Sequence, residues 1–290
     1  MRILVTGGAG YLGSRLLPEL CRLGADVDSI DWDHDKVSTG GSIRLRTSRA
    51  DVRFWEPPPL TEAYDVCIHL AALTGIRECA ASPVRAHETN VLAIRRGLNQ
   101  WGATRHIVIS TGGVYGAQKG VLTEEDDTLP EDVYCETKAR AEDEGLRAGN
   151  ACVLRLNHLT GISPKMRWRE IGNNLARDAA AGSVNIYDPD LSRPYLHVKD
   201  ASKIISTVAM MSDESFPYGG LFNVVAENKT KRDIGRVLGQ ITDAAIRFEQ
   251  RDLDRWDYRL SSEKMRNQLG IGPERTLADA LEEVVVECQI

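Results

Sequence analysis

The chain has 290 residues, with 36 Lys and Arg against 42 Asp and Glu, and a formal net charge of −6. Hydrophobic residues make up 42% and charged residues 27%, which is typical of a globular chain and excludes a disordered one. The acidic balance gives no reason to expect nucleic-acid binding, and no apolar run approaches the roughly 20 residues of a membrane span. The six cysteines are scattered without a CxxC pair, which predicts free thiols in a reducing cytoplasm and no metal site.

Short apolar runs alternate with helical patterns through the first half of the chain. Strands buried on both faces are expected at 3–5, 27–30, 66–70, 106–109 and 152–154, and helices at 11–23, 83–101 and 134–147. This alternation predicts an α/β fold, in which a doubly wound parallel sheet is covered by helices on both faces.

The pattern changes after residue 155, where loops lengthen. Helices are expected at 174–181, 200–211, 231–240 and 276–287, and short strands at 184–187, 221–225 and 245–248. We therefore expect a sheet domain of residues 1–155, onto which parts of 194–212 and 221–225 pack back. Residues 156–290 mainly form a smaller mixed α/β lobe. Because doubly wound sheets bind ligands at the carboxyl ends of their strands, a site is expected between the two.

A glycine-rich segment, residues 6–13, links the first strand to the first helix. Gly7 permits a tight turn, Gly10 lets a pyrophosphate approach backbone N–H groups, and Gly13 lets the helix pack closely on the sheet. A plain glycine-rich turn is the alternative. In this context the spacing favours a dinucleotide-binding loop, and residues 1–155 are expected to form the dinucleotide-binding domain.

Asp31 ends the second expected strand, about twenty residues after the glycine loop. A carboxylate there can accept both ribose hydroxyls of an adenosine and repels a 2′-phosphate. Further acidic residues follow at 33 and 35, and Lys36 is the only cation near in sequence. This favours NAD over NADP, the alternative being that Asp31 is a solvated acid at a strand end.

Tyr134 and Lys138 lie one turn apart on the same face of an expected helix. The ordinary pKa of tyrosine, near 10, makes it a poor base, but an adjacent ammonium favours the phenolate. Thr111 ends a strand about twenty residues upstream, where its hydroxyl can bond the same substrate oxygen. The alternative is an ordinary helix with an interfacial tyrosine and a solvated lysine.

These motifs jointly resemble the extended short-chain dehydrogenase/reductase family, the NAD-dependent nucleotide-sugar epimerases and dehydratases. The matching segments are 6–13, 50–53, 69–72, 89–91, 110–116, 193–200 and 261–270. The resemblance implies a Rossmann fold, NAD as cofactor, and Thr111, Tyr134 and Lys138 as the catalytic residues. The implied NAD contacts are Gly7, Gly10, Tyr11, Leu12, Gly13, Asp31, Asp51, Val52, Leu70, Ala71, Ala72, Asn90, Tyr134 and Lys138.

The same resemblance implies a nucleotide-diphosphate sugar as substrate. Its implied contacts are Thr74, Thr111, Asn157, His158, Arg193 and Arg255. Arg193 matches an arginine that contacts the diphosphate, which suits a bidentate guanidinium, and Arg255 aligns loosely with a second one. His158 stands where the family has a substrate-contacting asparagine, unless the register shifts and Asn157 takes that role. A buried, hydrogen-bonded imidazole is the other interpretation of His158.

Gly112 and Gly113 depart from the family pattern. Dehydratases have an Asp-Glu pair there, decarboxylases a Glu, and the 3,5-epimerases and 4-keto-epimerase/reductases a Cys at the second position. The remaining Thr, Tyr and Lys suffice for hydride and proton exchange at one carbinol.

We therefore expect an NAD-dependent nucleotide-sugar 4-epimerase that transiently oxidises C4. One alternative is an NAD(P)H-dependent reductase or dehydrogenase of a 4-ketosugar in deoxysugar biosynthesis, and another is a non-catalytic dinucleotide sensor. The resemblance also implies a cytoplasmic enzyme and a homodimer built through a four-helix bundle, with no membrane partner.

Overall fold

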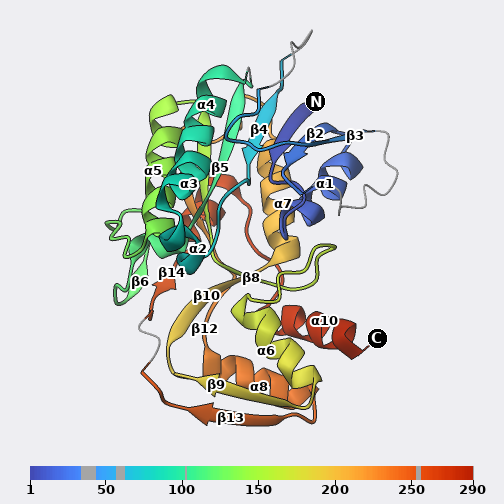
Figure 1. Cartoon of the computed structure of the whole chain (residues 1–290), viewed down its shortest axis with the longest axis vertical. Coiled ribbons are helices and arrows are strands. Elements are labelled where there is room, and N and C mark those ends of the chain that lie inside the picture. The colour runs from blue at the N-terminus through green and yellow to red at the C-terminus, as the bar shows by residue number, and fades with distance from the viewer. Residues whose placement is uncertain (34–43, 57–62, 102, 253–255, 290) are drawn as a thin grey trace. The chain divides into compact units, whose positions relative to one another are not determined.

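The computed structural model describes residues 1–33, 44–56, 63–101, 103–252 and 256–289. The chain forms two compact units (Figure 1). The first unit comprises residues 1–114, 130–155 and 202–222, and the second comprises 115–129, 156–201 and 223–290. No helix among the described residues has both the length and the apolar character needed to cross a membrane.

A seven-stranded sheet organises the first unit, in the order β11-β7-β5-β4-β1-β2-β3. Its strands are β1 (Arg2–Thr6), β2 (Asp26–Asp31), β3 (Leu45–Arg49), β4 (Val66–His69), β5 (Arg105–Thr111), β7 (Ala151–Leu156) and β11 (Leu221–Val224). The neighbours from β3 through β2, β1 and β4 to β5 are parallel. The predicted doubly wound α/β fold is confirmed.

Helices lie on both faces of this sheet, with α3, α4 and α5 on one side and α1 and α7 on the other (Figure 1). Their bounds are α1 (Gly13–Arg22), α2 (Ile76–Ala81), α3 (Pro83–His87), α4 (Ala93–Gln100), α5 (Val133–Ala148) and α7 (Val198–Ala209). The single helix expected at 83–101 is instead interrupted between α3 and α4 by a π-helical turn, η2 (Glu88–Leu92). A short 3-10 turn, η3 (Gly112–Tyr115), follows β5.

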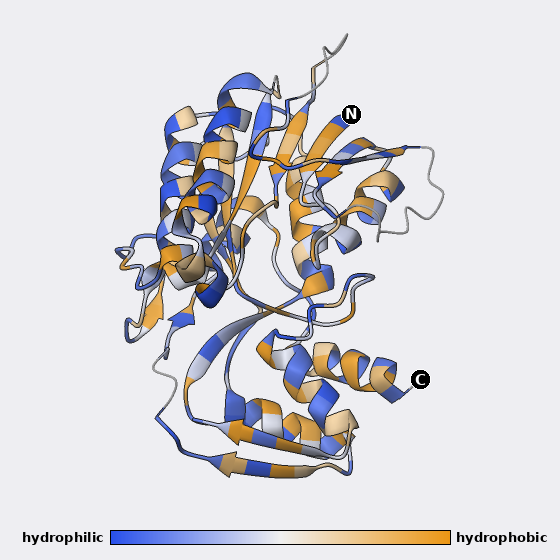
Figure 2. Ribbon diagram, viewed as in Figure 1, coloured by the Kyte–Doolittle hydropathy of each residue, from blue (hydrophilic) through white to orange (hydrophobic). Residues whose placement is uncertain are grey.

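The central strands of the first unit consist largely of hydrophobic residues, coloured orange in Figure 2, and these residues are buried in its core. Every residue of β4 and β7 is buried, as the continuous apolar runs predicted. On one face, α4 and α5 pack over β5 and β7 through Ile94, Val108, Ala141, Ala151 and Val153. Each large aliphatic side chain buried in this way contributes about 1.5–3 kcal/mol.

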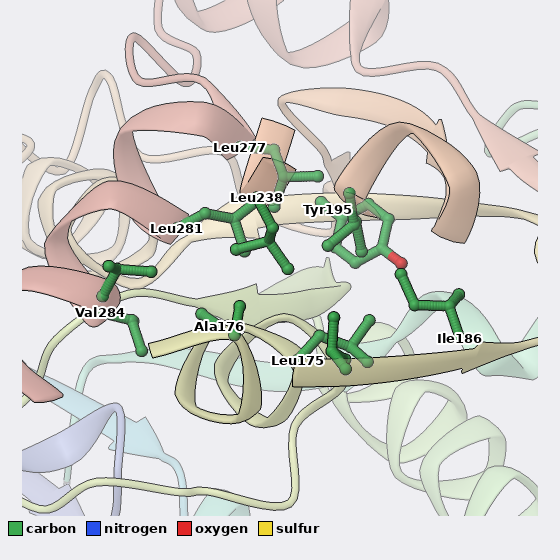
Figure 3. Packing of buried hydrophobic residues seen from close by; sticks show 12 residues of the cluster. Leu175, Ala176, Ile186, Tyr195, Leu238, Leu277, Leu281 and Val284 are labelled. Carbon is green, nitrogen blue, oxygen red and sulfur yellow. The ribbon is translucent and has the colours of Figure 1, made fainter. Parts of the chain in front are cut away.

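The second unit is mixed α/β. Its strands are β6 (Val121–Leu122), β8 (His158–Thr160), β9 (Ser183–Tyr187), β10 (Ser192–His197), β12 (Glu227–Thr230), β13 (Ala245–Glu249) and β14 (Arg259–Leu260). Its helices are α6 (Ile171–Ala180), α8 (Lys231–Ile241), α9 (Glu263–Leu269) and α10 (Leu277–Gln289). Figure 3 shows its core, where Leu175 of α6, Leu238 of α8 and Leu281 of α10 converge with Tyr195 of β10.

Several short strands were not expected from the sequence. β3 is an exposed edge strand with three polar or charged residues after Arg46, so it carries no apolar signal. β10 is buried throughout, but Arg193 and Pro194 interrupt its apolar pattern. β12 is half-buried and polar. In each case the pairing partner, and not the local sequence, determines the strand.

Candidate functional site

The glycine loop after β1 is packed so closely that a side chain at Gly7 or Gly13 would clash with backbone atoms. Gly7 has φ +77°, and a Cβ there would lie 2.6 Å from the backbone N of Ala71. A Cβ on Gly13 would lie 2.4 Å from the carbonyl oxygen of Gly7. A Cβ on Gly10 would meet only that same oxygen, at 3.3 Å, so this position remains approachable. The three glycines therefore have the separate roles that a dinucleotide-binding loop requires.

The N-terminus of α1 follows directly from this loop. The helix is ten residues long, and no side chain caps its first turn. The N–H groups and the dipole at such an end favour an anionic group. The residues present therefore fit the diphosphate of a dinucleotide.

Asp31 is buried at the end of β2, and both of its carboxylate oxygens already accept backbone hydrogen bonds. Oδ2 accepts from the N–H of Ala9 in the glycine loop, and Oδ1 accepts from the N–H of Asp33, each at 3.0 Å. Each oxygen keeps a lone pair for a further donor, so the fixed carboxylate can still accept ribose hydroxyls.

Arg49 lies beside Asp31 in the sheet. The sequence near Asp31 had shown Lys36 as the only cation. Arg49 is the register partner of Asp31 on β3, and its Nε donates to the carbonyl of Trp32 at 3.1 Å. Lys36 itself lies outside the described residues. Seventeen residues separate Arg49 from Asp31 along the chain, so the sequence around Asp31 did not indicate this cation.

Two further segments expected to contact NAD follow the ends of β3 and β4. Asp51 is held by the guanidinium of Arg53, which lowers the pKa of the Asp51 carboxyl. The carbonyl of Val52 accepts from Arg96 at 2.6 Å. After β4, the N–H of Ala71 donates to Thr6 Oγ1 at 3.1 Å, which ties the segment of Leu70, Ala71 and Ala72 to the glycine loop.

Asn90 is fully buried in the π-helical turn and braces this region. Its Oδ1 accepts from the N–H of Leu73, and its Nδ2 lies within hydrogen-bonding distance of Leu73 O and Thr137 Oγ1. Asn90 thus joins the loop that carries Thr74 to helix α5. The structure gives it a bracing role, and its contact with NAD remains a prediction.

Helix α5 presents the expected tyrosine and lysine. Asp132 caps the helix by accepting from the N–H of Cys135 at 2.9 Å, and this sets where the first turn begins. Tyr134 is half-buried, whereas Lys138, one turn later, is only 3% exposed. Burial lowers the pKa of Lys138 to about 8, against the opposing effect of Glu142. The ammonium therefore persists at neutral pH but releases its proton readily.

Thr111 ends β5, and the space beside it is filled from α5. Its Oγ1 accepts from the N–H of Gly113 at 3.2 Å. A Cβ on Gly113 would lie 2.8 Å from Cys135 Sγ, so the thiol occupies the place of a side chain at 113. Burial raises the pKa of the Cys135 thiol, which keeps it un-ionised. No sequence spacing had connected Cys135 with Gly113.

Glu142 and Arg155 form a buried ion pair that the sequence analysis missed. Arg155 of β7 donates to both carboxylate oxygens of Glu142, at 2.9 and 2.7 Å. Glu142 follows Lys138 by four residues on α5, so Tyr134, Lys138 and Glu142 recur at one-turn spacing. This one-turn spacing is the sequence feature that could have indicated Glu142 as part of the site.

One buried group among the described residues has the composition of a metal site. Ligand atoms of Cys67, His69 and His106 lie within 4.8 Å of one another. His69 Nε2 is 3.1 Å from His106 Nδ1, and the ring centroids are 5.3 Å apart, so the nitrogens face each other nearly in line, as in a hydrogen bond. Burial lowers the pKa of both imidazoles, that of His106 to about 4, so the pair is neutral. The geometry is that of a hydrogen-bonded pair in the core.

The second unit carries the remaining expected substrate residues. Arg193 of β10 is 2% exposed and donates to the carbonyl of Ser192 at 3.0 Å. β10 pairs with β8, where Tyr195 is opposite His158 and the two rings are 5.7 Å apart. Asn157 is buried immediately before β8. The fold thus places Arg193 and His158 on the paired strands β10 and β8, with Asn157 directly before β8, while Arg255 lies outside the described residues.

The seven-stranded sheet and glycine loop define a dinucleotide-binding protein, and the pairing of Tyr134 with Lys138 indicates an oxidoreductase-type site. Residues 3–225 match the NAD dependent epimerase/dehydratase family, and the chain belongs to it. This confirms the family expected from the sequence and that the protein is an enzyme. The expected cofactor agrees with a family that is NAD dependent.

Relatives and solved structures agree with this assignment. The UDP-glucose 4-epimerase of Lacticaseibacillus casei is 30% identical over 152 residues, or 49% of this chain and 45% of that protein. MoeE5 in complex with UDP-glucuronic acid and NAD is 25% identical, with a TM-score of 0.83 over 99% of this chain and 98% of that one. The UDP-glucuronic acid 4-epimerase of Bacillus cereus shares the fold at 22% identity, with a TM-score of 0.87 and 99% of each chain covered. The chain spans about half the length of the first curated relatives it matches.

Proposed function

We propose that this protein is an NAD-dependent nucleotide-sugar 4-epimerase that acts by transient oxidation at C4 of the hexose. The observation that carries the proposal is that Lys138 is buried one turn from Tyr134 on α5, in the same unit as Thr111 and the glycine loop. An ammonium in a low-dielectric site favours the phenolate form of a neighbouring tyrosine.

Each of the three side chains has a distinct role. Tyr134 as phenolate takes the proton from the sugar 4-hydroxyl and later returns it to the 4-keto oxygen. Thr111 donates a hydrogen bond to that same oxygen, and Lys138 stabilises the phenolate. NAD supplies hydride exchange with C4 when it is bound. The sugar presents its opposite face before the second exchange, which inverts C4.

The cofactor is held by the first unit in this proposal. The N-terminus of α1 beside Gly10 would hold its diphosphate, Asp31 would accept hydrogen bonds from its adenosine ribose, and Asp51 and Val52 would contact its adenine. Further contacts come from Tyr11, Leu12, Gly13 and the segment after β4. In the second unit, Arg193, Asn157, His158 and Arg255 bind the nucleotide diphosphate of the substrate, with Thr74 contributing from the first unit.

The surroundings of Thr111 favour epimerisation over dehydration. Neither Gly112 nor Gly113 offers an acid or base, and Cys135 Sγ fills the space that a side chain at 113 would need. The Cys135 thiol is un-ionised because burial raises its pKa. Thr111, Tyr134 and Lys138 therefore serve one carbinol oxygen, and Gly112 and Gly113 add no acid or base for a second carbon.

The experiment is a substrate panel followed by NMR. The purified chain is incubated with UDP-, dTDP- and GDP-hexoses and with UDP-hexuronic acids, since the two similar structures carry UDP-glucuronic acid. We expect interconversion of C4 epimers of one nucleotide sugar without net consumption of NAD or NADH. Stoichiometric consumption of NAD(P)H with any substrate would contradict the proposal.

A nucleotide-linked 4-ketosugar reductase is the second candidate, and Arg49 is the observation that favours it. An arginine next to the strand-end acid can accommodate a 2′-phosphate, and Arg49 lies in register with Asp31. Measuring the Kd of NAD and NADP by calorimetry discriminates the two. The epimerase proposal predicts that NAD binds at least tenfold more tightly, and the reductase gains support if NADP binds more tightly.

The assembly and location of the enzyme are also proposals. We propose a homodimer built through α4 and α5, and a cytoplasmic enzyme, in keeping with six cysteines that are all free thiols. Light scattering on the eluted protein measures the assembly: a mass of twice 32.0 kDa is expected, and a monomer contradicts it.

A further inference from the structure

The inward face of α5 carries an ionisable side chain at each of three successive turns: Tyr134, Lys138 and Glu142. Only the first two have a role in the proposed chemistry. Glu142 is nevertheless buried with a 5% exposed side chain, and it accepts two hydrogen bonds from Arg155, whose side chain is 4% exposed. A buried ion pair of this kind is seldom a source of net stability, because desolvation offsets the attraction.

Lys138 needs a compensating charge. It is buried, and burial disfavours its ammonium form; the carboxylate of Glu142, one turn further along α5, acts in the opposite sense. Without that carboxylate, burial would lower the pKa of Lys138 further. The ammonium form would then be less populated at neutral pH.

Among the described residues, Glu142 is the neighbour whose charge raises the pKa of Lys138. His69, at the end of β4, is neutral, because burial holds its pKa well below the ordinary value and the charge of Lys138 lowers it further. The π-helical turn packed on α5 contributes the uncharged Asn90, which bonds Thr137. The thiol of Cys79 on α2 has its pKa raised to about 11, chiefly by burial, and is un-ionised.

Arg155 fixes the geometry of Glu142. The two parallel hydrogen bonds from its guanidinium orient the carboxylate as a planar fork, which a lysine could not do. Arg155 also comes from β7, so the strand holds the carboxylate in place on the helix. A carboxylate held in this way responds little when the charge on Lys138 or Tyr134 changes.

We propose that Glu142, oriented by Arg155, is a positioning residue that keeps Lys138 in its ammonium form and thereby sets the pH at which Tyr134 can accept a proton. This inference rests on the proposed function for its link to Tyr134. Its link to Lys138 stands on the one-turn spacing of the two buried side chains on α5 and on the carboxylate that Arg155 holds in place, and it can be tested without any substrate.

The direct test is an NMR titration of Lys138 in the full chain, with labelled lysine and the Lys138→Arg variant to assign the signal. In Glu142→Gln we expect the pKa of Lys138 to fall below that of the wild type by one unit or more. In the activity assay, kcat at pH 7 falls at least tenfold, KM for the nucleotide sugar changes less than threefold, and the pH optimum moves to alkaline values. Glu142→Asp restores most of both readouts.

The matched control is Glu144→Gln on the same helix. Glu144 accepts two hydrogen bonds from Arg95 at the same 2.9 and 2.7 Å, but the Arg95 side chain is 52% exposed. We expect no change in the Lys138 titration or the pH profile. Because Glu142→Gln can destabilise the fold, its titration is repeated in sucrose, which favours the compact state, and the Lys138 pKa must again be lower than that of the wild type.

A Lys138 titration that is the same in the wild type and in a folded Glu142 variant overturns the proposal. That outcome differs from a failure of the proposed function, in which the wild type epimerises no nucleotide sugar while the Lys138 titration still responds to Glu142.

Discussion

Helix α5 has two faces that carry similar residues to different effect. Its inward face holds Lys138 and Glu142 beneath the surface, with Glu142 paired to Arg155. Its outward face holds two ion pairs at one-turn spacing, Glu136 with Arg140 at 4.0 Å and Asp143 with Arg147 at 3.9 Å, all four at least half exposed.

The difference between the faces is the surrounding medium. Water screens the outward pairs, whereas the inward charges interact through protein, where a single charge strongly affects a neighbour's proton affinity. The same residue types therefore serve solubility on one face and proton transfer on the other. Substitutions on the two faces should differ accordingly, from a large loss of activity to almost no effect.

The largest effect is expected at the first inward position. Tyr134→Phe removes the hydroxyl that exchanges the proton, so kcat should fall by about 10²- to 10⁴-fold while the fold is retained. Coupled NMR assays of the nucleotide-sugar epimers measure the rate, and circular dichroism checks the fold. Activity within fivefold of the wild type would exclude Tyr134 as the acid/base group.

The next largest effect concerns stability. Arg155→Met leaves the Glu142 carboxylate buried without its fork of donors, and we expect the free energy of unfolding to fall by about 3–5 kcal/mol. Urea unfolding measures it. Arg147→Met on the outward face is the control, and a loss there equal to that of Arg155→Met would remove the distinction between the faces.

Lys138→Met is expected to stabilise the folded chain in a pH-dependent way. The Lys138 pKa is about 8 when folded and near 10.5 when exposed, so below pH 8 the folded state bears the full cost of the buried charge, about 3 kcal/mol. Between pH 8 and 10.5 the unfolded wild type binds more protons, and wild-type stability rises with pH. The advantage of Lys138→Met at pH 7 should therefore vanish near pH 10.

Urea unfolding of the wild type and Lys138→Met from pH 6 to 10 tests this. Lys203→Met, at an exposed lysine of α7, should leave the pH dependence unchanged. A difference between the wild type and Lys138→Met that stays constant across this range would mean that the lysine is not desolvated.

The smallest effect is expected for Arg95→Ala. Arg95 and Glu144 form a well-aligned ion pair, but the Arg95 side chain is 52% exposed. Such pairs contribute less than about 1 kcal/mol, and less at high salt. Urea unfolding at low and high salt measures the loss in the free energy of unfolding. A loss above about 2 kcal/mol would mean that this exposed pair contributes as a buried pair does.

Much of the first unit could be predicted because its signals are local. Continuous apolar runs mark β4 and β7, and the one-turn spacing of Tyr134 and Lys138 places both on one face of α5. The glycine spacing is also a local signal, and Gly13 is required by contacts with Gly7 and Gly8, although Gly7 is required by a distant contact with Ala71 after β4.

The rest depended on contacts between distant residues. Arg49 faces Asp31 only because β3 pairs with β2, and β3 itself has no apolar pattern. Cys135 fills the space at Gly113 because α5 packs on the end of β5. Glu142 meets Arg155 only through the packing of α5 on the sheet. Nothing in the sequence near any of these residues records its partner.

The central claim is that one carbinol carbon is oxidised and reduced within a single site. It is tested most directly with the nucleotide sugar identified by the substrate panel, labelled with deuterium at C4. The account predicts that the epimer formed retains the deuterium at C4, with no label lost to water and none found in added NAD. Loss of the label to solvent, or an unlabelled product, would contradict the proposed reaction.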